Sequence, residues 1–472
     1  SYSVTGVQTC ALPISGAGVK QIAGWERGFD RLSKAWLPAP ARHDVLALAL
    51  LACLWLLLAV TGWGAWAHPH VDDGRELQLP VEIASGKALY RDLAYPYGPA
   101  APYLNAAVVM VAGPRIEVFF VLGLLVTLLG VGLVYGVTRL LVWPALAWAP
   151  AAYWLAAGLR PWFVDTVVPY SHAAVYGSLT ILAALWLACR NLKLGQVRAS
   201  AWIPALAGLA MLFKIEFALP ALLIVVVHAA GLGWRQRALA ALGPLAAAAV
   251  YAGLTLWLGY EFMFQDNFNW TPDSYFFRHF GGAMLSPAVW NSTPEGVVKG
   301  AIWWVALWGG SAVVFSRLPE RASWIAAAAM GVFLWYRAPM RVLRHGVLNE
   351  TLFWIVVCVC VAATVRVIRT RQTGLAHIAL ASAVAALTSM RAAGHAGMGS
   401  SFVPYTIPMV MALAALVQAA VQFVSARMGG GFRSAPAGIL LVAALFCLIA
   451  NRTSGREFVW HGGLEAAASE RG

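Results

Sequence analysis

Four charged side chains lie within five consecutive positions, where Asp72, Asp73 and Glu76 supply carboxylates and Arg75 supplies a guanidinium. They follow an apolar run, 45–67, that is long enough to cross a bilayer. A carboxylate at the mouth of a helix bundle can act as a general base. The planar donor fork of arginine can hold a phosphate or orient a carboxylate. The simpler interpretation is a solvated loop whose charges keep the preceding helix from sliding.

Tyrosines alternate with charged residues in the stretch YRDLAYPYGPAAPYLNA, residues 90–106. Tyrosine is enriched at membrane interfaces in general, so anchoring of the chain at the interface explains much of this pattern. The Gly98-Pro99 turn redirects the chain into the next segment. The side chains of this stretch that we count as candidate site residues are Tyr90, Arg91, Asp92 and Tyr97.

Further candidates lie in later apolar segments. His172 is expected at the outer mouth of its helix, either as a site residue or as an interfacial hydrogen-bonding residue. Lys214 and Glu216 stand two positions apart, so on one helix they would not face each other and could cap a turn. A charge at membrane depth costs at least about 2.5 kcal/mol. If Lys214 is buried, we therefore expect its ammonium to have an anionic partner such as a phosphate.

A divalent cation is an alternative near the first cluster. His68, His70, Asp72 and Asp73 form an H-x-H-x-D-D run, and two histidines with a carboxylate are a legitimate ligand set. Pro69 lies between the histidines and leaves their local geometry undefined. We expect no cofactor, with a divalent metal at this run as the alternative.

The composition indicates which elements must position these residues. Only 11% of the 472 residues are charged and 61% are apolar, whereas a soluble globule carries roughly a quarter charged residues. We therefore predict an all-α polytopic membrane protein with about 13 transmembrane helices. The net charge of +13 fits basic cytoplasmic loops better than nucleic acid. The helices are expected near 45–67, 116–138, 143–159, 172–189, 199–213, 217–232, 238–259, 300–315, 322–336, 348–365, 374–390, 402–421 and 436–450.

Charge placement predicts an orientation. With a cytoplasmic N-terminus, most short basic connections fall inside, as the positive-inside rule requires, and most acidic residues fall outside. The segment 100–113 is too short to span, so we expect a helix in the outer interface. An aromatic-rich outer loop, 260–299, fits a lipid-tail groove or an ordinary aromatic belt. Basic residues on the outer side suit an anionic lipid phosphate: Arg337, Arg341, Arg344, His345 and Arg391.

The order of these motifs resembles the first outer loop of GT-C polytopic glycosyltransferases, in the subgroup called glycosyltransferase family 39-like, similar to protein mannosyltransferases and aminoarabinose transferases. VVPYSHAAVYG (167–177) and GLAMLFKIEFALP (208–220) resemble two further segments of that subgroup, and the resemblance covers most of 45–220. The first-loop residues that carry it are Asp72-Asp73-Gly74-Arg75-Glu76, Gly86, Leu89-Tyr90-Arg91-Asp92, Tyr97-Gly98-Pro99 and Tyr103-Leu104-Asn105-Ala106.

The resemblance implies a GT-C-like bundle with outer-face loops and interfacial helices, in a bacterial inner membrane. It implies an enzyme that takes sugar from a polyprenyl-phosphate donor and gives it to a lipid, glycan or protein acceptor. The family's catalytic aspartate falls on Asp72, and Asp73 beside it is the second residue expected to be catalytic. The resemblance also implies that His172 lies at the outer mouth, opposite the first loop. The expected substrate-binding residues are Arg75, Glu76, Tyr90, Arg91, Asp92, Tyr97, His172, Lys214, Glu216 and Arg391.

Two alternatives belong to other classes. A transporter or flippase of lipid-linked sugars would use similar basic residues but should carry broken helices in paired positions, which the sequence does not suggest. A noncatalytic membrane scaffold would tolerate a neutral residue at 72. The expected organisation is a non-native or disordered leader 1–19, a cytoplasmic segment 20–44, a GT-C-like catalytic module 45–220 with the first outer loop 68–115, a remaining bundle 221–450, and an outer tail 451–472.

Overall fold

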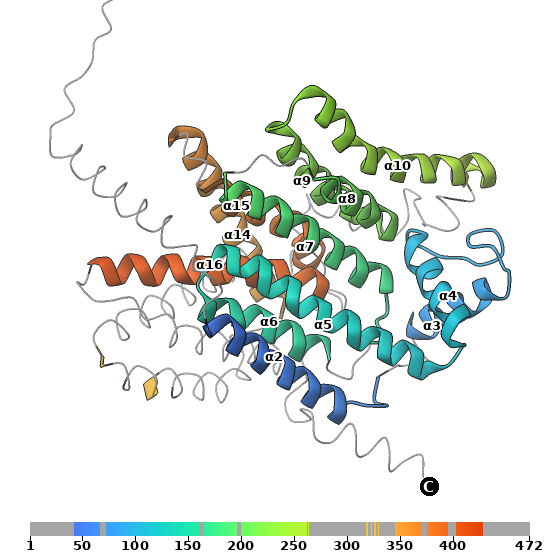
Figure 1. Ribbon diagram of the computed structural model, residues 1–472, viewed down its shortest axis with the longest axis horizontal. Coiled ribbons are helices and arrows are strands. Elements are labelled where there is room, and N and C mark those ends of the chain that lie inside the picture. The colour runs from blue at the N-terminus through green and yellow to red at the C-terminus, as the bar shows by residue number, and fades with distance from the viewer. Residues whose placement is uncertain are drawn as a thin grey trace, which may run out of the picture. The chain divides into compact units, whose positions relative to one another are not determined.

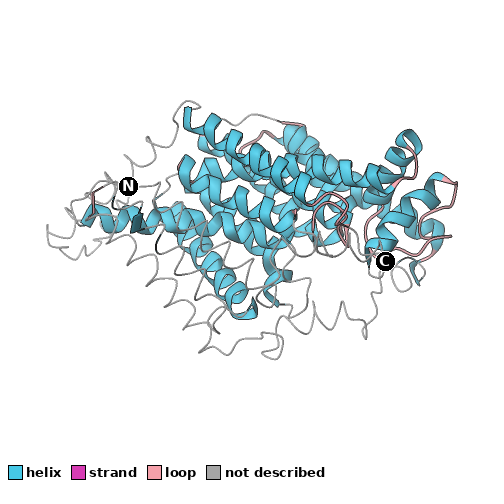
Figure 2. Cartoon of the chain, turned by 90° about the horizontal axis from the view of Figure 1, so that it is seen from below, coloured by secondary structure: helices cyan, strands magenta, loops and turns pink. Residues whose placement is uncertain are grey.

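A computed structural model describes residues 42–66, 72–159, 165–195, 200–261, 263, 345–370, 375–394 and 403–427, with isolated positions between 318 and 329. In these parts of the chain every regular element is a helix, as the sequence predicts (Figures 1 and 2). Several predicted features fall on residues that the structure does not describe. These are the leader 1–19, His68 and His70, most of the loop 260–299, the spans near 300–315 and 436–450, residues 337–344 and the tail 451–472.

Four of the described helices are long and apolar enough to cross a membrane. This supports a helical membrane protein, and the full number of spans stays a prediction. The four helices are α2 (Arg42–Thr61), α5 (Ile116–Leu141), α7 (His172–Lys193) and α10 (Trp234–Leu258). Other helices overlap the expected segments, with ends that differ by up to six residues: α6 (Pro144–Gly158), α14 (His345–Thr370), α15 (Ala376–Gly394) and α16 (Val403–Arg427).

The simplest interpretation of the first acidic cluster was a solvated loop, but residues 72–84 form a helix, α3 (Asp72–Ala84). Two aspartates in the first turn favour this start, since the positive end of the helix dipole attracts negative charge. The next helix, α4 (Ala100–Ala112), forms where a short helix is expected. It begins after the Gly98-Pro99 turn and ends at Gly113, which adopts a φ of 87°. Helices α3 and α4 pack against each other.

A pair of short helices follows α7. Helix α8 (Trp202–Phe213) ends at Lys214, whose backbone is extended, and the 3₁₀ turn η1 (Ile215–Phe217) leads into α9 (Ala218–Ala230). Each of the two α-helices is shorter than the roughly 20 residues of a full span. Because the helical hydrogen-bond pattern stops at Lys214, the side chains on either side of the break do not follow ordinary helical spacing.

Helix α7 lies at the centre of the bundle. Most of its side chains are buried, and it contacts α5, α8, α9 and α15. Helix α16 packs on α6 and α15 and also touches α7. Figure 1 shows α3 and α4 together beyond one end of α5 and α7, close to the end of α10. The amino-terminal residues of α7 therefore meet the first cluster.

Candidate active site

Helix α3 carries the three carboxylates of the acidic cluster, and they differ in how far they are exposed. Asp72 is exposed, with 48% of its side chain accessible, and it pairs with Arg75 one turn later at 2.9 Å. Asp73 is fully buried, and Glu76 is 3% exposed. Of the three carboxylates, Asp72 is thus the one that a substrate could reach, while Glu76 points into the protein.

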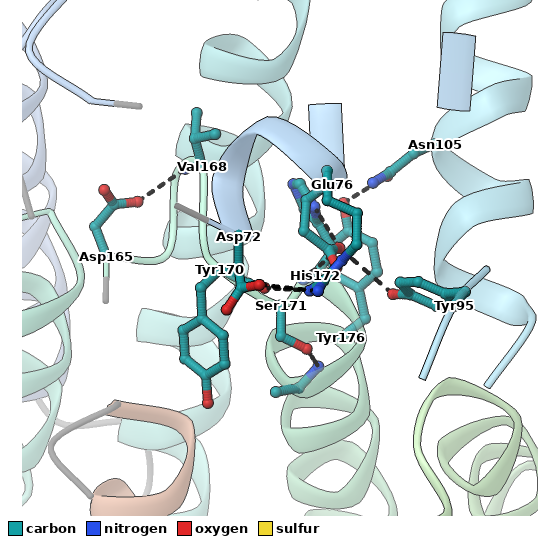
Figure 3. A network of polar contacts seen from close by, with 12 residues as sticks. Asp72, Glu76, Tyr95, Asn105, Asp165, Val168, Tyr170, Ser171, His172 and Tyr176 are labelled. Carbon is teal, nitrogen blue, oxygen red and sulfur yellow. Dashed lines mark hydrogen bonds and ion pairs between the residues drawn. The ribbon is translucent and has the colours of Figure 1, made fainter. Parts of the chain in front are cut away.

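Glu76 meets the amino terminus of α7. Its Oε2 accepts a hydrogen bond from the backbone amide of His172 at 3.1 Å and lies 3.2 Å from Nδ1 of the same residue (Figure 3). Ser171 caps this helix by accepting from the amide of Ala174. A carboxylate at the start of a helix is favoured by the free amides and the dipole. This contact joins residues 96 positions apart.

Arg75 extends the network. It donates to Oε1 of Glu76 and to the backbone carbonyl of Tyr170, both at 3.3 Å. Its guanidinium lies 5.9 Å from the ring centre of Tyr95 and 5.6 Å from that of Tyr97. Burial lowers the pKa of Arg75, but nearby negative charge, mainly from Glu76, outweighs it, so the pKa is raised above its ordinary value. The side chain is 29% exposed, so part of this cation faces outward.

The tyrosines of the first loop support this arrangement from within. Tyr95 is fully buried, and its hydroxyl donates to Oε2 of Glu76 at 3.4 Å. Tyr90, with a φ of 70°, donates to the backbone carbonyl of Tyr97 at 2.6 Å. Burial raises the pKa of both phenols well above the usual value, so they stay neutral donors at physiological pH. Tyr90 is 1% exposed and therefore orders the loop rather than facing a substrate.

Arg91 and Asp92 lie apart from this network. They pair with each other at 2.8 Å on the exposed side of the loop, and Arg91 lies over the ring of Trp257 in α10. The hydrogen bond from Arg91, together with one from the amide of Ala88, lowers the pKa of Asp92 to about 2. In this position the pair can anchor the loop on α10.

A second group of polar side chains surrounds the break between α8 and α9. Lys214 is 2% exposed, and its ammonium forms an ion pair with Glu216 at 3.4 Å. It also donates to the hydroxyl of Tyr405 at 2.8 Å and lies 4.1 Å from the ring centre of Tyr97. On one continuous helix Lys214 and Glu216 would not face each other, but α8 ends at Phe213, and the extended backbone at Lys214 with the 3₁₀ turn after it brings the two charges together at a turn.

Tyr97 joins the two groups. The centre of its ring lies 5.6 Å from the guanidinium of Arg75 and 4.1 Å from the ammonium of Lys214. Both cations therefore lie beside the same ring. The adjacent turn packs tightly against the end of α8, where the amide of Gly98 donates to the carbonyl of Phe213 at 3.1 Å. The first loop and the helix break thereby form one site.

Several residues of this site were not among the site residues that the sequence predicted. Asp165 is fully buried and accepts from the amides of Val167 and Val168, which shapes the turn before α7. The hydroxyl of Tyr176 donates to buried Asn105 at 2.8 Å and ties α7 to α4. Asp165 could have been noticed as a lone acid in an apolar loop. Nothing local marks Tyr405, which is 191 residues from its partner Lys214.

Two predictions are left open by the described residues. Arg391 lies on α15, but its side chain is outside the described part of the structure. Among the described side chains no group of three or more His, Cys, Asp or Glu could hold a metal ion. Because His68 and His70 lie outside the described residues, the cation alternative stays a prediction.

Comparison with known proteins finds no matching family model, no matching curated protein and no matching solved structure.

Proposed function

We propose that this protein is a membrane glycosyltransferase that moves a sugar from a polyprenyl-phosphate donor to an acceptor hydroxyl or amine on the outer, periplasmic face of a bacterial inner membrane. One observation carries the proposal, namely that an accessible carboxylate, Asp72, pairs with Arg75, and that Arg75 shares the ring of Tyr97 with a second cation, Lys214. A base next to a phosphate-binding group is what sugar transfer from a lipid phosphate requires.

The reaction is a single displacement. The acceptor oxygen or nitrogen attacks the anomeric carbon and gives its proton to Asp72, while the bond from that carbon to the phosphate oxygen breaks. Polyprenyl phosphate leaves with the bonding electron pair, and the anomeric configuration inverts. Asp72 suits the role of base because it is the accessible carboxylate among Asp72, Asp73 and Glu76. Asp73 is fully buried, so we assign it a supporting role behind Asp72.

The departing phosphate gains negative charge in the transition state. Fixed positive groups placed where charge develops supply a large share of catalysis in many enzymes. Arg75 has a planar fork for two phosphate oxygens, and Lys214 adds a point charge. Glu76 and His172 hold Arg75 and the start of α7 in place. The apolar helices around the site lie in the bilayer, and the lipid donor enters the site from there.

The test compares the wild-type protein with Asp72→Asn. Both are purified, reconstituted in lipid vesicles and supplied with native lipid extract containing a radiolabelled pool of polyprenyl-phosphate sugars. We expect the variant to lose at least about 100-fold in transfer rate, the usual contribution of a general base. The control is Glu82→Gln, which neutralises a carboxylate on the same helix that pairs with Lys87 instead. Equal transfer by wild type and Asp72→Asn would remove Asp72 as the base.

One observation favours a second candidate, a transporter or flippase of lipid-linked sugars. The interruption between α8 and α9, with buried Lys214 at the break, resembles the discontinuous helices that hold substrates in transporters. Translocation of a fluorescent polyprenyl-phosphate sugar across vesicles, without transfer to any acceptor, would favour this candidate. A scaffold would show neither reaction.

A further inference from the structure

Tyr405 connects a distant helix to the break between α8 and α9. It lies in the first turn of α16 and is 1% exposed. Its hydroxyl accepts a hydrogen bond from the ammonium of Lys214 at 2.8 Å and donates one to Oε2 of Glu216 at 3.1 Å. Its ring stacks on Phe217 with the ring centres 6.3 Å apart. A single hydroxyl thus bridges a buried cation and its carboxylate.

The two hydrogen bonds of this bridge run in the favourable direction, from Lys214 to Tyr405 and from Tyr405 to Glu216. An ammonium can only donate and a carboxylate can only accept, so a hydroxyl between them uses both of its capacities in the correct direction. Hydrogen bonds to charged groups are shorter and stronger than neutral ones. The arrangement is closed by the direct contact between Lys214 and Glu216 at 3.4 Å. The three groups therefore fix one another.

Lys214 needs such support because its side chain has a flexible four-carbon stem. The attraction of Glu216 alone would draw the ammonium toward that carboxylate. The shorter contact with Tyr405, at 2.8 Å, opposes that pull, and in this position the ammonium lies 4.1 Å from the ring centre of Tyr97. The same ring lies 5.6 Å from the guanidinium of Arg75.

We propose that Tyr405 is a positioning residue, which holds the ammonium of Lys214 beside Tyr97 so that it binds the phosphate of a lipid monophosphate. This inference rests on the proposed function for the identity of the ligand. It gives α16 a part in the site, although α16 lies far from the acidic cluster in the sequence.

The experiment measures binding of polyprenyl monophosphate to the purified full chain by native mass spectrometry, with the uncharged polyprenyl alcohol as a reference lipid. Tyr405→Phe removes the hydroxyl but keeps the ring on Phe217. We expect about tenfold weaker binding of the phosphate lipid, the scale of one hydrogen bond to a charged group, and unchanged binding of the alcohol. In the transfer assay the KM for donor should rise by a similar factor with kcat nearly unchanged.

The matched control is Tyr153→Phe, which removes another buried tyrosine hydroxyl, one that contacts Thr406 on α16. If both variants weaken phosphate binding equally, the effect is on the fold and the inference is overturned. Unchanged binding by Tyr405→Phe, or wild-type binding no tighter for the phosphate than for the alcohol, also overturns it. If wild type binds the phosphate lipid in a Tyr405-dependent way but transfers no sugar, the positioning role stands and the proposed function fails.

Discussion

Glu76 shows how one buried carboxylate can hold several parts of the chain together. A guanidinium, a phenol, a backbone amide and an imidazole all lie within hydrogen-bond distance of it. These donors come from α3, from the first loop and from α7. A buried acceptor with several donors fixes the relative positions of its neighbours, and leaving those donors unpaired is costly.

We therefore predict that Glu76→Gln destabilises the protein. The amide loses the charge that pairs with Arg75, and its NH₂ group opposes the donors on His172. Because Arg75 is partly exposed, we expect a loss of about 2 kcal/mol in the free energy of unfolding. The measurement is detergent-induced unfolding of the purified protein, with Glu82→Gln as the control on the same helix. A stability equal to wild type would show that the network contributes little.

At the scale of elements, the site depends on the contact between the first loop and the end of α8. A methyl group on Gly98 would lie 2.1 Å from the carbonyl oxygen of Leu212 and 2.6 Å from the hydroxyl of Tyr251. That hydroxyl already donates to the carbonyl of Met211 at 2.8 Å. Only glycine therefore allows the turn to approach α8 this closely, and the approach places Tyr97 against Lys214.

Gly98→Ala should push the turn away from α8. Overpacking of a close contact costs about 1–3 kcal/mol, and the displacement separates Tyr97 from Lys214. We expect a lower unfolding midpoint together with a raised KM for the lipid phosphate donor. Gly253→Ala is the control, since a methyl group at that position in α10 meets nothing within 4 Å. Wild-type values for Gly98→Ala would show that the turn does not need this approach.

The exposed side of the same loop has its own pH dependence. The pKa of Asp92 is lowered to about 2, from an ordinary value of 3.8, by hydrogen bonds from Arg91 and the amide of Ala88. A carboxyl whose pKa is lower in the folded state stabilises the fold above its ordinary pKa, and this contribution is lost as the pH falls through the folded value.

Hydrogen exchange at the Ala88 amide should therefore become less protected as the pH falls from about 4 to 2, after correction for the intrinsic exchange rate. The same amide in Asp92→Asn should be weakly protected at every pH in this window. Protection in the wild type that does not change with pH would mean that the carboxylate does not hold the loop.

At the scale of the whole molecule, the apolar surface indicates where lipid lies. Helix α10 exposes large apolar side chains along much of its length, including Leu239, Leu245 and Leu256. One of its ends carries Arg235 over Trp234, and the other carries Trp257 under Arg91 of the first loop. If α10 spans the membrane, its basic start and the first loop lie on opposite sides, with the basic start in the cytoplasm.

Cysteine labelling tests this orientation. The six native cysteines are replaced, and a single cysteine is introduced at either of two exposed positions, as Ser85→Cys or Arg235→Cys. We expect Ser85→Cys to react with a membrane-impermeant maleimide in spheroplasts, and Arg235→Cys to react only after the membrane is opened. Labelling of Arg235→Cys in intact spheroplasts would reverse the orientation and place the site in the cytoplasm.

The sequence alone determined the class of protein and the approximate positions of its helices, because apolar length and the placement of Gly, Pro and charge are local properties. The segments expected near 172–189 and 238–259 form helices of similar bounds. The sequence also singled out Asp72, Arg75, Glu76 and Lys214, since charges beside long apolar runs are rare.

Only the tertiary structure decided which of these residues meet. Sequence spacing places Glu76 far from His172, and Lys214 far from Tyr405, yet both pairs are in contact. Packing of helices from distant parts of the chain creates such contacts, and no local pattern encodes them. The same packing buries Asp73 and leaves Asp72 accessible, although the two are adjacent and chemically identical. A helix turns successive side chains by about 100°, so the neighbours of each one, and not its type, set its role.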